Sequence, residues 1–199
     1  MGMGEPMMNL DNVLDACALL PDLGITNRRT TISTIGWIPG IEQLTAQPRP
    51  VRLALSLHAA DPDLRTQIMP VNERYPLSDV LAACRRNFNS NNRKVYIEYV
   101  MLAGVNDGED HALDLARVLQ PRKAFKVNLI PYNPTDSPYE GSNRDAIEAF
   151  KEVLEEKHIP TTVRLTRGRD IAAACGQLAA ASTPVAASTS AATSAPSSS

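Results

Sequence analysis

The segment VRLALSLHAADPDLRTQIM, residues 51–69, determines how this chain is expected to fold. Residues 51–59 form an apolar run that is typical of a β-strand. A helical pattern follows at residues 62–69. Ser56 and His58 interrupt the apolar pattern just where the strand ends. We therefore predict a strand–helix unit with polar side chains at the carboxyl end of its strand.

The same alternation recurs along the whole chain. Strands are predicted at residues 29–36, 51–59, 94–102, 125–133 and 161–168, and helices at about 9–20, 62–69, 77–88, 109–120 and 143–157. This order predicts an α/β fold in which parallel strands form a sheet and helices cover it. Because the strands read as apolar runs, we expect the sheet to be buried on both faces.

The composition fits a globular domain with a short tail. The 199 residues are 43% hydrophobic and 21% charged, and the formal net charge is −2. Residues 1–179 are expected to be ordered, whereas residues 180–199 contain only small residues and proline and are expected to be disordered. The sequence has no apolar run of the roughly 18 residues that a bilayer requires and no signal-peptide pattern. We therefore expect a cytoplasmic protein with no membrane partner.

The three cysteines are Cys17, Cys84 and Cys175. Their wide spacing fits neither a disulfide framework nor a Cys-x-x-Cys metal site. Cys17 and Cys84 lie on the apolar faces of predicted helices and are expected to be buried. For Cys175, spacing alone favours a buried residue over a nucleophile, although two nearby arginines are candidates for lowering the pKa of its thiol.

Polar residues at the predicted strand ends form a candidate ligand-binding rim, because ligands of parallel α/β sheets collect at the carboxyl ends of the strands. Each residue also has a structural interpretation. Ser33 can bond the local backbone, His58 can be a satisfied structural histidine, and Asn133 can be a turn residue before proline. Glu5 can support the start of a helix. Only their joint occurrence favours a site.

Arginines are concentrated near the first and last predicted strands. They are Arg28, Arg29, Arg164, Arg167 and Arg169. The planar guanidinium group is suited to phosphate, so an RNA or nucleotide substrate is consistent with this pattern. A solvated surface is the commoner explanation for any one of them.

Six stretches taken together resemble one enzyme family. They are GMGEPMMNLDNV, TISTIGWIPGI, LALSLHAADPDLR, IEYVMLAGVND, VNLIPYNP and TRGRDIAAACGQLA, and they run over essentially all of residues 1–179. In this order they resemble the radical S-adenosylmethionine (SAM) enzymes of the RlmN type, which methylate C2 of an adenine in 23S ribosomal RNA. The resemblance implies a partial (β/α) barrel of the radical SAM type.

The resemblance also implies the roles of particular residues. Gly4 and Glu5 would hold the amino group of SAM, since a carboxylate suits an ammonium group. The rest of the cofactor site would be formed by Ser33, Ser56, Leu57, His58 and Asn133. Cys175 matches the cysteine that accepts a methyl group and becomes S-methylcysteine. A 5′-deoxyadenosyl radical then takes hydrogen from that methyl group, and the carbon radical adds to C2.

The implied cofactors are SAM and a 4Fe-4S cluster, and the implied partners are 23S ribosomal RNA and a reductant such as flavodoxin. Transfer RNA as substrate and C8 of the same adenine as the methylated atom are alternatives that these residues do not separate. The family's Cys-x3-Cys-x2-Cys cluster loop has no counterpart in this sequence, so we expect no metal ligands here. We expect a C-terminal fragment that is inactive alone. The rival expectations are a remnant that only binds SAM or RNA, and a fragment that does not fold.

Overall fold

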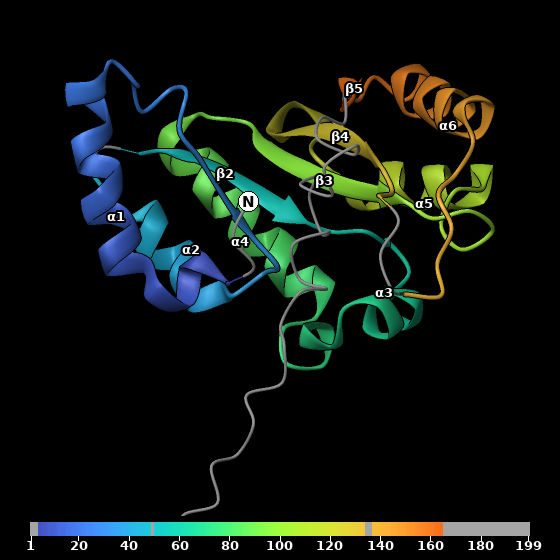
Figure 1. Ribbon diagram of the computed structural model, residues 1–199, viewed down its shortest axis with the longest axis horizontal. Coiled ribbons are helices and arrows are strands. Elements are labelled where there is room, and N and C mark those ends of the chain that lie inside the picture. The colour runs from blue at the N-terminus through green and yellow to red at the C-terminus, as the bar shows by residue number, and fades with distance from the viewer. Residues whose placement is uncertain (1–3, 49, 134–136, 165–199) are drawn as a thin grey trace, which may run out of the picture.

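The computed structural model describes residues 4–48, 50–133 and 137–164. Its five strands form one sheet in the order β1-β2-β3-β4-β5, and every neighbouring pair is parallel. The strands are β1 (Thr31–Thr34), β2 (Arg52–Ser56), β3 (Val95–Met101), β4 (Phe125–Pro131) and β5 (Thr161–Val163). The predicted α/β fold with a parallel sheet is confirmed (Figure 1).

Helices precede and separate these strands. The α-helices are α1 (Leu10–Leu19), α2 (Ile38–Thr45), α3 (Pro62–Ile68), α4 (Leu77–Asn91), α5 (Glu109–Val118) and α6 (Arg144–Glu156). Short 3-10 helices are η1 (Pro6–Asn9), η2 (Leu20–Leu23), η3 (Pro70–Glu73) and η4 (Arg122–Ala124). Among the described residues, no helix combines the length and the apolar character needed to cross a bilayer.

Helix α2 is the α-helix that the sequence pattern did not predict. Pro39 and Gly40 read as turn residues, yet both lie in its first turn. Proline is tolerated there because the first N–H groups of a helix have no partner within the helix. Gly40, Ile41 and Leu44 form the buried side of α2, and α2 packs against α4. The predicted boundary at residue 179 and the tail at 180–199 lie outside the described residues.

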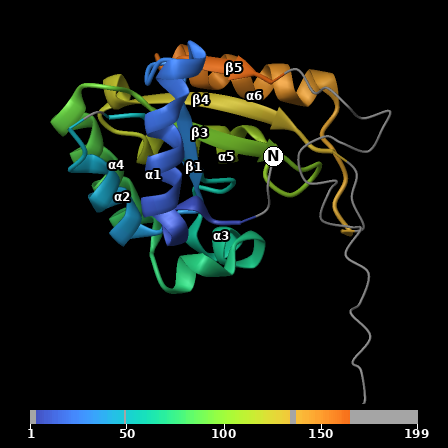
Figure 2. The same cartoon turned by 60° about the vertical axis from the view of Figure 1, so that its left-hand side comes forward.

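The two faces of the sheet differ. On β3 the side chains of Val95, Ile97, Tyr99 and Met101 are fully buried, whereas those of the alternate residues are only partly buried. Helices cover the buried face, with α4 and α5 behind the sheet in Figure 1. Figure 2 brings forward the edge of the sheet where α1 lies beside β1. Among the described residues, the expectation of a sheet buried on both faces is wrong, because polar residues alternate with apolar ones on β3 and the side chains on the other face, here called the open face, are only partly buried.

Asn106 joins the carboxyl ends of β2 and β3. Its side chain is fully buried, and its Nδ2 group donates to the carbonyl oxygens of His58 and Val100 at 2.8 Å each. Its Oδ1 atom accepts the N–H of Leu102 at 2.8 Å. The hydroxyl of Tyr99 donates to the backbone carbonyl of the same asparagine at 2.8 Å. One buried amide thus fixes the carboxyl ends of β2 and β3 and the start of the loops that follow them.

Candidate functional site

Two adjoining cavities lie on the open face of the sheet. One of about 510 Å³ extends over β2, β3 and β4, and another of about 700 Å³ lies between the η1–α1 segment and β1. Thr31, Ser33 and Ser56 line both. These volumes are in the range typical of small-molecule sites. The open face is therefore the candidate functional site.

Six of the seven residues that the sequence analysis assigned to a cofactor line these cavities. Ser33, Ser56, His58 and Asn133 line the smaller cavity, and Gly4, Glu5, Ser33 and Ser56 line the larger one. The exception is Leu57, whose side chain is fully buried in the core. Successive side chains of an extended chain point to opposite faces, so a leucine between Ser56 and His58 turns away from the site. The Leu57 side chain supports the site from behind.

Glu5 links the N-terminal segment to the end of β1. Its Oε1 atom accepts the N–H of Met7 at 3.0 Å and so caps η1, as the structural interpretation of this residue expected. Its Oε2 atom accepts the N–H of Ile35, just beyond β1, at 2.9 Å. Each carboxylate oxygen has two lone-pair sites. Glu5 therefore keeps capacity for a further donor, such as an ammonium group in the larger cavity.

His58 is held in one tautomer by the strand beside it. Its backbone has a positive φ of 60°, and its Nδ1 atom accepts the N–H of Val100 at 3.1 Å. Burial, together with the charge of Arg65, lowers the pKa of His58 to about 4. A neutral imidazole that accepts at Nδ1 carries its proton at Nε2. His58 therefore has one N–H donor available for a ligand in the smaller cavity.

We expect acidification from about pH 6.5 to about pH 4 to destabilise the fold through His58. The pKa is lowered from 6.5 to about 4 on folding, so the unfolded chain binds the extra proton within that window and stability falls as the pH falls. Thermal unfolding as a function of pH measures how steeply the stability depends on pH.

His58→Asn, which keeps a residue tolerant of positive φ, should make the stability less dependent on pH in this window. His158→Asn is the matched control, since His158 also has a φ of 60° but is exposed. An equal slope in His58→Asn and the parent would contradict the assignment.

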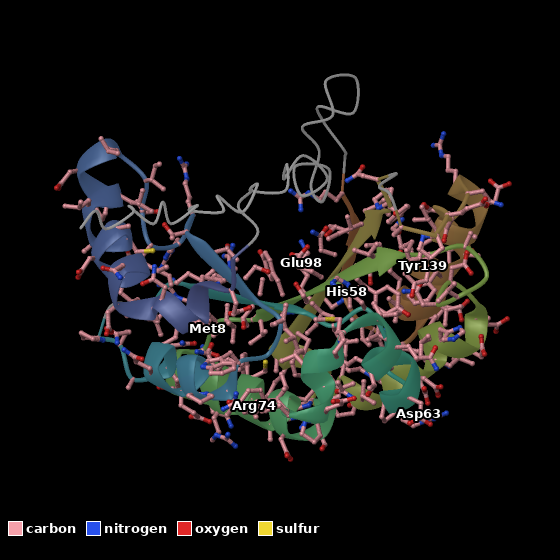
Figure 3. The ribbon with its side chains drawn as sticks, turned by 60° about the horizontal axis from the view of Figure 1, so that its bottom comes forward. Met8, His58, Asp63, Arg74, Glu98 and Tyr139 are labelled. Carbon is pink, nitrogen blue, oxygen red and sulfur yellow. The ribbon has the colours of Figure 1, made fainter. Side chains whose placement is uncertain are left out.

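A row of polar side chains crosses the sheet beside His58. Ser56, Glu98, Asn128 and Thr162 occupy matching positions on β2 to β5. The Glu98 Oε2 atom accepts from Asn128 Nδ2 at 2.8 Å, and Asn128 Oδ1 accepts from Thr162 Oγ1 at 3.3 Å. Burial raises the pKa of Glu98, while the hydrogen bond from Asn128 and the charge of Arg164 oppose that rise. Figure 3 shows Glu98 and His58 close together on the sheet, whereas Arg74 and Asp63 lie at the lower rim of the view.

Sequence reasoning missed Glu98 and Asn128 because it treated their strands as uniformly apolar. The signal that could have found them is a charged or amide side chain at every second position of an apolar strand, which marks a half-open face. Of the arginines noted in the sequence, Arg164 lines the smaller cavity, whereas Arg28 and Arg29 are exposed before β1. Arg167, Arg169 and Cys175 lie outside the described residues.

The two described cysteines do not fit a metal cluster. Cys84 is buried in the core, and burial raises the pKa of its thiol to about 12. Cys17 was expected to be buried, but it is only half-buried and lines the larger cavity, because the surface of α1 is open there. Within residues 4–48, 50–133 and 137–164, no three His, Cys, Asp or Glu side chains are grouped as metal ligands. The described residues therefore do not fit a 4Fe-4S cluster, and none is assigned to one.

The donor set does fit a nucleoside that carries an amino acid. Glu5 offers a carboxylate in one cavity, while the other combines the amides of Asn128 and Asn133 with apolar groups of Val100 and Ile130. Apolar walls with a few polar groups at fixed positions are typical of cofactor sites. SAM has an adenosine end and an ammonium-bearing end, and it matches this division.

Known proteins similar to this chain include named RNA methyltransferases. A protein of Moorella thermoacetica described as "Probable dual-specificity RNA methyltransferase RlmN" is 45% identical over 189 residues, covering 93% of this chain and 53% of that protein. The Desulfotalea psychrophila "Dual-specificity RNA methyltransferase RlmN" is 46% identical over 183 residues, covering 90% of this chain and 50% of that protein. This chain thus spans about half the length of the curated relatives that it matches.

Solved structures agree with the fold. A radical SAM methyltransferase from Sphaerobacter thermophilus superposes with a TM-score of 0.85 at 43% identity, covering 89% of this chain and 53% of that one. A domain of pyruvate-formate lyase-activating enzyme from Bacteroides vulgatus shares the fold, with a TM-score of 0.64 at 17% identity and coverage of 83% of this chain and 97% of that one. The family model described as "Radical SAM superfamily" matches residues 1–116, the segment that contains Glu5, Ser56 and His58. This superfamily implies SAM and a 4Fe-4S cluster as cofactors, and the chain belongs to it.

Proposed function

We propose that this chain provides the SAM-binding part of an RNA methyltransferase that methylates C2 of an adenine in 23S ribosomal RNA. The observation that carries the proposal is that six of the residues that the resemblance assigns to SAM line two adjoining cavities. The names of relatives at 45% and 46% identity support the reaction class and RNA as substrate. The words "dual-specificity" in those names support a second RNA substrate, for which we propose transfer RNA. We also propose a cytoplasmic location and a reductant such as flavodoxin.

The residues of the site have distinct tasks in this proposal. When bound, SAM supplies the methyl group and, on reductive cleavage, a radical. Glu5 holds the amino group in the larger cavity and keeps it beside the end of β1. His58 donates from Nε2 while its Nδ1 atom stays bonded to Val100. Asn133 and the apolar side chains around it hold the adenosine end and exclude water from it.

Two parts of the proposal concern Cys175, which lies outside the described residues, and the cysteines that would bind the iron–sulfur cluster. Cys175 is proposed as the residue that carries the methyl group as S-methylcysteine. The three cysteines of the chain are too far apart in sequence for the family's cluster loop. We therefore propose that the chain alone is inactive. A SAM- or RNA-binding role without catalysis is the alternative, and methylation at C8 is the alternative chemistry.

Isothermal titration calorimetry of the purified chain with SAM tests the proposal. We expect binding, and we expect Glu5→Gln to weaken it about 10-fold, because a neutral amide replaces the charge-assisted hydrogen bonds of the carboxylate. Glu156→Gln is the matched control, since Glu156 is exposed at the end of α6, outside the residues that line the two cavities. No SAM binding by the parent, or equal binding by parent and Glu5→Gln, would overturn the assignment of this site.

A further inference from the structure

Arg65, on α3, is a fully buried cation. Among the described residues no carboxylate lies within ion-pair distance of it. Burial lowers its pKa to about 10, so the guanidinium group remains charged at neutral pH. A buried charge without a counter-ion is costly and requires that its hydrogen bonds be satisfied by other groups. The acceptors that Arg65 contacts therefore indicate what the residue does.

The acceptors of Arg65 join two neighbouring strand ends. Its Nε atom donates to the carbonyl oxygen of Leu57, beyond β2, at 3.2 Å, and its Nη2 atom donates to that of Ile35, beyond β1, at 3.0 Å. Its Nη1 atom donates to Asn72 Oδ1 at 2.6 Å. Figure 1 shows α3 beyond the carboxyl end of β2, where this bridge is built. One rigid group thus connects α3 to two strand ends.

Asn72 keeps its oxygen directed at Arg65. Its Nδ2 group donates to the carbonyl oxygen of Pro62 at 3.1 Å and to Thr66 Oγ1 at 2.9 Å, and both of these residues lie on α3. Because both donor contacts are made, the amide cannot rotate without losing them. The side chain that accepts the hydrogen bond from Nη1 is therefore itself held in one orientation. This favours a specific orientation of the guanidinium group over an incidental contact.

One bridged carbonyl belongs to the turn that contacts Glu5, and the other belongs to the segment that carries His58. The N–H of Ile35 donates to Glu5 Oε2 while the carbonyl of the same residue accepts from Arg65. Leu57 directly precedes His58, whose backbone adopts a φ of 60°. Gly36, with a φ of 110°, completes the turn after β1, and a Cβ there would lie 3.6 Å from Arg65 Nη2. Arg65 therefore acts on both polar residues through the backbone.

We propose that Arg65 is a positioning residue for the ligand site: it fixes the turn after β1 that donates to Glu5 and the segment after β2 that carries His58, without touching the ligand itself. The identity of that ligand as SAM rests on the proposed function. Lysine would keep the positive charge but not the planar set of donors, since an ammonium group cannot reproduce the fixed directions of the guanidinium N–H groups. Arg65→Lys is therefore the informative variant.

Two measurements on the 199-residue chain test this role. In Arg65→Lys we expect SAM affinity measured by calorimetry to fall about 10-fold, and the amide hydrogen of Ile35 to exchange about 10-fold faster by NMR. Arg85→Lys is the matched control, because Arg85 also donates to two backbone carbonyls, those of Gln120 and Val118 at the end of α5. We expect it to change neither quantity by more than about 2-fold.

A second variant keeps the test decisive if Arg65→Lys does not fold. Asn72→Ala removes the acceptor of Nη1, together with the two hydrogen bonds that Asn72 donates to α3. It leaves the Arg65 guanidinium group in place and should change both quantities in the same direction by about 3-fold. Unchanged affinity and exchange in the folded variants would overturn the proposal. So would a uniform acceleration of exchange at all amides, because that pattern indicates general stability and not positioning. If the parent binds no SAM, the proposed function fails, and the exchange of Ile35 alone decides the role of Arg65.

Discussion

Replacing Asn106 with alanine is expected to lower the free energy of unfolding by about 3–5 kcal/mol, a large part of the stability of a typical domain. The substitution removes all three side-chain hydrogen bonds to the ends of β2 and β3. Two carbonyl oxygens and one N–H group then remain in the interior without their partner. Leaving a buried polar group unpaired costs about 1–3 kcal/mol, more than the net gain from a typical hydrogen bond.

Urea unfolding of Asn106→Ala and Asn87→Ala measures this difference. Asn87 is also buried, at 2% exposure, but within the described part of the chain its side chain makes only two hydrogen bonds: it donates to Thr45 Oγ1 at 2.9 Å and accepts from Asn91 Nδ2 at 3.5 Å, and neither partner is a backbone group. We expect this control to lose only about 1–2 kcal/mol. Asn106→Asp should resemble Asn106→Ala, since a carboxylate would face two carbonyl oxygens. If Asn106→Ala and Asn87→Ala lose the same free energy, Asn106 does not join the strands as described.

Replacing Gly40 with alanine is expected to destabilise the fold by about 2–3 kcal/mol and to weaken ligand binding as well. A Cβ at this position would lie 2.5 Å from Met7 Cβ and 3.0 Å from the carbonyl oxygen of Met7. The backbone of η1 must therefore move, and Glu5 caps η1 through the N–H of Met7. Alanine normally stabilises a helix by about 1 kcal/mol relative to glycine. A net loss of stability in Gly40→Ala would therefore be caused by the steric contact with Met7.

Thermal unfolding and SAM calorimetry of Gly40→Ala, with Gly108→Ala as control, measure both effects. A Cβ at Gly108 would also meet an atom at 2.5 Å, but that atom is Oδ1 of Asp110, whose side chain is 82% exposed and can rotate away. We expect the control to stay within about 0.5 kcal/mol of the parent. Wild-type stability in Gly40→Ala would show that η1 can shift at no cost and that the position of Glu5 does not depend on this contact.

Local patterns predicted most of the fold because the hydrophobic pattern of each strand or helix extends over several consecutive residues. The strands at 51–59 and 94–102 were expected from apolar runs, and the structure has them at Arg52–Ser56 and Val95–Met101. The first of these strands ends earlier than expected because the backbone of His58, with a φ of 60°, leaves the extended conformation. Helix α2 was missed because Pro39 and Gly40 have turn propensity, which packing against η1 and α4 overrides.

The candidate site was predictable where it follows strand ends and unpredictable where it depends on tertiary contacts. Ser56 and His58 stood out as polar residues after an apolar run, and both line a cavity. Glu98 was hidden within a strand whose half-open face is visible only once the sheet is built. In the sequence, Arg65 looks like an ordinary helix residue. Its backbone acceptors, Ile35 and Leu57, lie 30 and 8 residues away in sequence, so its role depends on tertiary contacts.

The alternation along the central strands separates two sets of positions that selection can act on independently. On β3, Val95, Ile97 and Tyr99 belong to the core, while Tyr96 and Glu98 meet the cavity. A combinatorial library restricted to the even-numbered positions of β2, β3 and β4 would therefore explore which molecules the protein accepts while leaving the packing against the helices intact. The same separation gives evolution a route to new specificities on an unchanged scaffold, in which ligand preference drifts along one side of a strand and foldability is conserved on the other.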